Sequence, residues 1–86
     1  MIDDKTNYSI KDEHDDSTTI SLPKLVADTL QLELSDVHAW IQDEYNAVVK
    51  SHPKLSRRKK GNHVREIALA RARTSPRYRA MLDASF

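Results

Sequence analysis

The chain has 86 residues, a formal net charge of +1 and no cysteine. This length allows one small domain, and the lack of cysteine excludes disulfide bonds and metal sites built on thiolates. No apolar run reaches the roughly 18 residues that a membrane-spanning helix needs, so we expect a cytoplasmic protein with no membrane partner. Small domains without disulfides often need a partner chain, and we expect this one to oligomerise.

Residues 1–16 are polar and acidic, with six Asp or Glu against two Lys. Their large apolar side chains are Ile2, Tyr8 and Ile10, which are too few to offset the entropy cost of ordering the segment. We therefore predict a disordered acidic tail over 1–16. It either acts only as a solubilising end or competes with an anionic partner for the basic part of the chain.

A short strand is predicted over 17–22, where polar and apolar side chains alternate. Ile20 and Leu22 share one face with Thr18. The side chains of the opposite face are Ser17, Thr19 and Ser21. One strand cannot satisfy its own backbone hydrogen bonds. We therefore expect it to pair with the same strand of a second copy about a two-fold axis.

Two helices are predicted directly after this strand. The first covers 23–33 and begins at Pro23, which is tolerated in a first helical turn. The second covers 36–50 and follows Ser35, a plausible N-cap. Apolar side chains recur at helical spacing in both segments. The predicted core of the dimer is Ile20, Leu22, Leu25, Val26, Leu30, Val37, Trp40, Ile41 and Val48.

The C-terminal third is strongly basic, because residues 50–79 hold eleven Lys or Arg and a single acid, Glu66. We expect 51–62 to be a linker, since it contains Pro53 and the one glycine of the chain. The segment 63–86 is predicted as a helical extension. The fold class is thus mostly α, with one short β-strand per chain, a disordered acidic tail and a basic helical extension.

The stretches TTISLPKLVADTL (18–30) and SDVHAWIQDEY (35–45) resemble the ribbon-helix-helix repressors of the MetJ/Arc/CopG type. The resemblance covers roughly 17–50. It implies an intertwined homodimer whose paired strands enter the major groove of double-stranded DNA. It also implies base contacts from Thr19 and Ser21, with Ser17 at the margin, and a phosphate contact at Ser35.

Affinity for nucleic acid comes largely from phosphate neutralisation. The basic segment is therefore expected to clamp the DNA backbone while the strand reads bases. Its other use is to grip a protein partner, because extensions of this kind can fold on binding. Besides Ser35, the predicted phosphate contacts are Lys24, Arg57, Arg58, Lys59 and Lys60.

Three functions stay open. The leading one is an autoregulatory, sequence-specific repressor of the plasmid or toxin–antitoxin type, reading repeated half-sites with or without higher-order assembly on DNA. The second is an antitoxin-like module whose residues 53–86 bind and inhibit a toxin or other protein. The third is a three- or four-helix protein, monomeric or weakly dimeric, in which 17–22 is only an extended lead-in and the basic helix 63–74 binds DNA or RNA.

No enzymatic function is expected. The four histidines, His14, His38, His52 and His63, lack the spacing of metal ligands. One glycine cannot form a glycine-rich phosphate loop. The sequence therefore predicts no catalytic residue, no metal and no cofactor.

Overall fold

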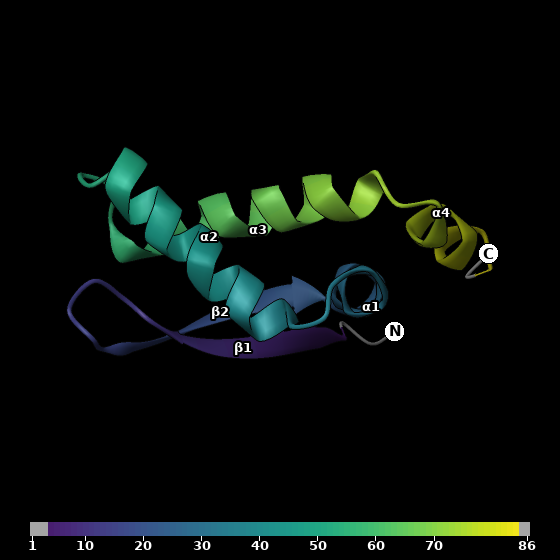
Figure 1. The fold of residues 1–86 in the computed structure, drawn as a ribbon, viewed down its shortest axis with the longest axis horizontal. Coiled ribbons are helices and arrows are strands. Elements are labelled where there is room, and N and C mark those ends of the chain that lie inside the picture. The colour runs from purple at the N-terminus through teal and green to yellow at the C-terminus, as the bar shows by residue number, and fades with distance from the viewer. Residues whose placement is uncertain (1–3, 85–86) are drawn as a thin grey trace.

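The computed structural model describes residues 4–84. The elements in chain order are β1 (Lys5–Lys11), β2 (Ser17–Pro23), α1 (Lys24–Glu33), α2 (Val37–Ser51), α3 (Arg57–Arg73) and α4 (Pro76–Ala84). The chain is mostly helical and opens with a two-stranded antiparallel sheet. In Figure 1, α2 crosses the hairpin diagonally, α3 runs along it, and α1 and α4 lie at the end away from the hairpin turn. None of the helices within 4–84 has the length and apolar character to cross a membrane.

Strand β1 corrects two predictions, the disordered tail and the single strand. It pairs with β2 from Lys5 opposite Pro23 to Lys11 opposite Ser17. Its alternating pattern buries two side chains of the supposed tail, Tyr8 and Ile10, on the inner face of the hairpin. These two side chains suffice to order the segment, because they extend the apolar face that Ile20 and Leu22 of β2 form. Residues 1–3 of the predicted tail lie outside the described part of the chain.

The acids between the strands form the hairpin turn. The Asp12 carboxylate accepts hydrogen bonds from the backbone N–H groups of His14 at 2.8 Å and Asp16 at 2.9 Å. Asp15 adopts a left-handed conformation with φ of 64°. Asp tolerates this region better than most residues, because its short side chain bonds locally. These acids therefore order the turn, where the sequence indicated only a charged tail.

The core lies between the hairpin and the first three helices. Seven of the residues predicted for the core of a dimer are buried within this single chain: Ile20, Leu22, Val26, Leu30, Val37, Ile41 and Val48. Leu25 and Trp40 are only half-buried, because they lie at the borders of the apolar stripes of α1 and α2. The remaining buried apolar side chains are Tyr8, Ile10, Ala27, Tyr45, Val64, Ala68 and Ala72.

Helix α3 is a part of this core, and the predicted linker is shorter than 51–62. The helix begins at Arg57, where the Ser56 hydroxyl accepts a hydrogen bond from the Lys59 N–H at 3.2 Å. Gly61 lies inside the helix, and a Cβ there would be 3.4 Å from Ile20 Cδ1. The glycine therefore marks the point where α3 approaches β2, and it does not break the helix.

Polar side chains bond outward-facing backbone groups on both edges of the hairpin. On β1, the Gln42 amide accepts from the Lys11 N–H and donates to the Lys11 carbonyl, both at 2.8 Å. His38 Nε2 donates to the Ser9 carbonyl. On β2, Arg65 Nε donates to the Ser21 carbonyl at 3.1 Å. These bonds occupy backbone groups that a further strand would need. The strand therefore has its partner within the chain, and an unpaired strand is no longer a reason to expect a second copy.

Candidate nucleic-acid interface

The exposed face of the hairpin carries uncharged polar and basic side chains, apart from Pro23 at its end. In a chain with 13 Asp and Glu, none of the acids lies on this face. The members of this face follow from the strand geometry, because every second side chain of each strand points away from the core. The side chains are Lys5, Asn7, Ser9 and Lys11 from β1, and Ser17, Thr19 and Ser21 from β2.

Cross-strand pairs order this face. Ser21 lies opposite Asn7, and its hydroxyl donates to Asn7 Oδ1 at 2.6 Å. Lys11 Nζ donates to the Ser17 hydroxyl at 3.4 Å. The three base contacts implied by the resemblance thus share one surface with Asn7. The sequence interpretation missed Asn7 and the two lysines of β1. The alternation of polar and apolar residues over 5–11 was the signal for them.

Two arginines of α3 flank the β2 edge. The bond from Arg65 to the Ser21 carbonyl fixes one guanidinium beside the strand. Arg58 precedes Arg65 by seven residues, which is about two helical turns, so it lies on the same side of α3. Arg58 is exposed and has no ion-pair partner among residues 4–84. Lys24 follows β2 directly and pairs with Asp28 at 3.3 Å on the surface. Exposed pairs of this kind hold a cation only weakly.

The other predicted phosphate contacts lie elsewhere. Lys60 is 3% exposed and donates to the Glu13 carboxylate, so its burial removes it from the surface that DNA could reach. Arg57 Nε lies 3.3 Å from Asp12 Oδ2. Lys59 is exposed, but on the side of α3 opposite its buried stripe. The cluster 57–60 is therefore split, because one helical turn points its side chains in different directions.

The phosphate site predicted at Ser35 is already filled by a side chain. Asp36 is the N-cap of α2, and its carboxylate accepts a hydrogen bond from the Ala39 N–H at 3.0 Å. This acid takes the place at the helix N-terminus that an anion would occupy. Ser35 is exposed one residue earlier.

The hairpin turn is tied to both long helices by a polar network. The bond from Lys60 to Glu13 holds the pKa of that carboxyl below its usual value. The Asp12 pKa is lowered chiefly by the backbone N–H of Asp16. The Tyr45 hydroxyl donates to Glu13 Oε1 at 3.4 Å, and burial raises the pKa of Tyr45 to about 12. Asp12 and Glu13 thus contact Arg57 and Lys60 of the basic segment, as ion pairs that belong to the hairpin turn.

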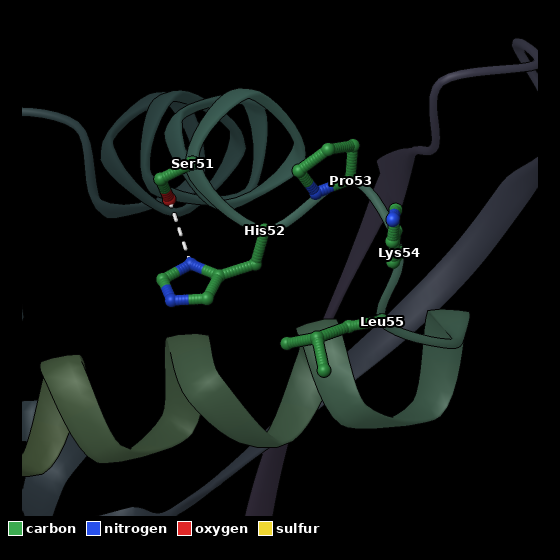
Figure 2. Close-up of a pocket in the computed structure, with 5 residues that line it drawn as sticks. All are labelled: Ser51, His52, Pro53, Lys54 and Leu55. Carbon is green, nitrogen blue, oxygen red and sulfur yellow. Dashed lines mark hydrogen bonds between the residues drawn. The ribbon is translucent and has the colours of Figure 1, made fainter.

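A shallow depression of about 340 Å3 lies at the connection of α2 and α3. Figure 2 shows Ser51, His52, Pro53, Lys54 and Leu55 around it, with the His52 ring directed towards α3. The Ser51 hydroxyl lies 2.8 Å from His52 Nδ1, but it also bonds the Ala47 carbonyl at 3.0 Å. Ser51 thus satisfies the C-terminus of α2, and we assign this depression no function.

We expect Glu13→Gln to lower the midpoint of thermal unfolding at pH 7, because it leaves the buried Lys60 ammonium without its partner. The lowered pKa of Glu13 stabilises the fold above its ordinary value of 4.5, and this contribution is lost as the pH falls. The variant should therefore lose less stability than the wild type between neutral pH and about pH 3.

The measurement is thermal unfolding by circular dichroism across this pH range. Asp43→Asn is the matched control, because Asp43 is exposed on α2 and has no ion pair within the described chain. Equal unfolding midpoints for the two variants at pH 7 would show that the Glu13–Lys60 pair does not hold the turn.

No family model, curated protein or solved structure matches this chain.

Proposed function

We propose that the protein binds double-stranded DNA through the exposed face of its β-hairpin, as a sequence-reading regulator of the repressor type. One observation carries the proposal, namely a two-stranded ribbon with an acid-free polar face and basic side chains beside it. The major groove of B-DNA admits a two-stranded ribbon, and hydroxyl and amide groups can bond base edges there. No other surface of the described chain combines these features.

The side chains divide between two roles. The two central cross-strand pairs, Asn7 with Ser21 and Ser9 with Thr19, lie where the ribbon would be deepest in the groove. They are proposed to contact base edges. Cations at the ends and along the β2 edge are proposed to contact phosphates, which supply affinity without sequence preference. These cations are Lys5, Lys11, Arg58 and Arg65.

A second candidate function has its own observation. Helix α4 has no fully buried residue over 76–84, and Leu32 of the neighbouring α1 is 56% exposed. The two helices lie side by side (Figure 1). An antitoxin-like contact with another protein would therefore use α4 and α1. The whole of 53–86 is not available for it, because α3 is committed to the core.

We expect Asn7→Ala/Thr19→Ala to lose sequence preference while keeping its fold, because both side chains are exposed. A good base contact contributes about 1–3 kcal/mol of discrimination, so the preference for the selected site should fall roughly tenfold or more. The measurement is fluorescence anisotropy with the preferred duplex and a scrambled one. Asn46→Ala/Thr74→Ala removes the same side chains from an exposed position in α2 and from the exposed C-cap of α3, and it should leave the preference intact. An unchanged preference in the first variant would rule out the hairpin as the reader.

We expect Arg58→Ala to weaken binding to every duplex and to reduce the slope of log affinity against log salt by about 1. Lys59→Ala removes a charge from the neighbouring position, which faces away from the hairpin, and should leave the slope nearly unchanged. Titrations at several salt concentrations separate the two. Equal losses in both variants would mean that α3 contributes only general charge and does not flank the groove.

A further inference from the structure

We propose that one copy of the chain is a complete DNA reader and that its preferred site is short and asymmetric. The sequence alone predicted the opposite, repeated half-sites read by a homodimer. The inference rests on the proposed function, DNA binding through the hairpin face, and specifies the kind of duplex which that face fits.

Both strands of the ribbon come from one chain, and they pair continuously from the Lys5–Pro23 pair to the Lys11–Ser17 pair. A ribbon made from two copies would contain two identical strands related by a two-fold axis. Here the strands differ in sequence, so nothing in the ribbon requires a second copy.

Side chains of α2 and α3 already bond several backbone groups at the ribbon edges. A strand from another copy would have to displace Gln42 from both backbone groups of Lys11, or Arg65 from the Ser21 carbonyl. His38 also occupies the Ser9 carbonyl. Side-chain coverage of this kind is a known defence against edge-to-edge pairing. These bonds hinder the addition of a third strand to the two-stranded sheet.

The exposed face of the ribbon is asymmetric in its side chains. A two-fold axis through the centre of the ribbon would place Asn7 on the position of Thr19 and Lys5 on that of Ser17. An amide and a hydroxyl bond different base edges, and a lysine contacts phosphate where a serine does not. The flanks differ as well, with arginines of α3 along β2 and neutral or weakly basic side chains of α2 along β1. The two halves of the bound duplex therefore meet different chemistry.

The length of the site follows from the ribbon. The exposed face spans four cross-strand pairs at every second residue, from Lys5–Pro23 to Lys11–Ser17. Six residue steps of a strand extend ~20 Å. With a rise of ~3.4 Å per base pair, the face covers about 6 base pairs of duplex.

The test is selection of the full chain on a random duplex library at physiological salt, where nonspecific phosphate binding is weak. Sedimentation velocity on one selected duplex then gives the stoichiometry. We expect a non-palindromic preference over about 6 base pairs and one chain per duplex. Asn7→Ala should change the preference in one half of the site only, and Thr19→Ala in the other half.

The outcomes separate failure of this inference from failure of the proposed function. A palindromic or repeated site with two chains, in which each substitution changes both halves, overturns this inference and leaves DNA reading intact. No enrichment of any sequence overturns the proposed function, and the inference with it. An asymmetric site bound by one chain supports both.

Discussion

Strand β1 is the hydrogen-bonding partner of β2. The inner face of the two strands is the apolar surface on which α1, α2 and α3 pack. Tyr8 and Ile10 from one strand lie next to Ile20 and Leu22 from the other, and all four side chains are buried. Without β1, the apolar face of the sheet would be half as wide, and the β2 backbone would lack its interstrand hydrogen bonds. The helices would then cover an open surface, which is the situation that led the sequence interpretation to a second copy.

The same pairing also creates the candidate binding surface. Alternation along each strand means that burying Tyr8 and Ile20 exposes their neighbours Asn7 and Thr19 on the opposite face. The position of this face relative to α3 is fixed at one end by the ion pair between Glu13 of the turn and the buried Lys60. Core, charge network and binding face therefore depend on one another, and the DNA-binding proposal follows from how the hairpin is held.

The spacing of apolar residues along the sequence predicted the elements whose structure depends mainly on neighbouring residues. Period-two alternation gave β2, and helical spacing gave α1 and α2 with most of their buried residues. Strand β1 was missed because average composition over 1–16 hid a short alternation around Tyr8. The start of α3 was missed because Gly61 and the basic cluster favoured a loop. The ion pairs of that cluster join the hairpin turn to α3, across more than forty positions of the sequence, and no local pattern shows such contacts. Hence Thr19 and Ser21 were predicted as surface residues of a strand, whereas Asn7 was missed together with the strand that carries it.

The most direct test is whether the two strands of the ribbon come from one chain. Because the Ser9 carbonyl points outward to His38, Ser9 and Thr19 form a pair without mutual hydrogen bonds, whose Cα atoms lie ~4.5 Å apart. Isotope-filtered NMR on a mixture of 13C-labelled and unlabelled protein separates contacts within a chain from contacts between chains. We predict a strong Hα–Hα cross-peak between Ser9 and Thr19 within one chain. The same cross-peak found only between labelled and unlabelled chains would contradict the account, because the ribbon would then be built from two copies.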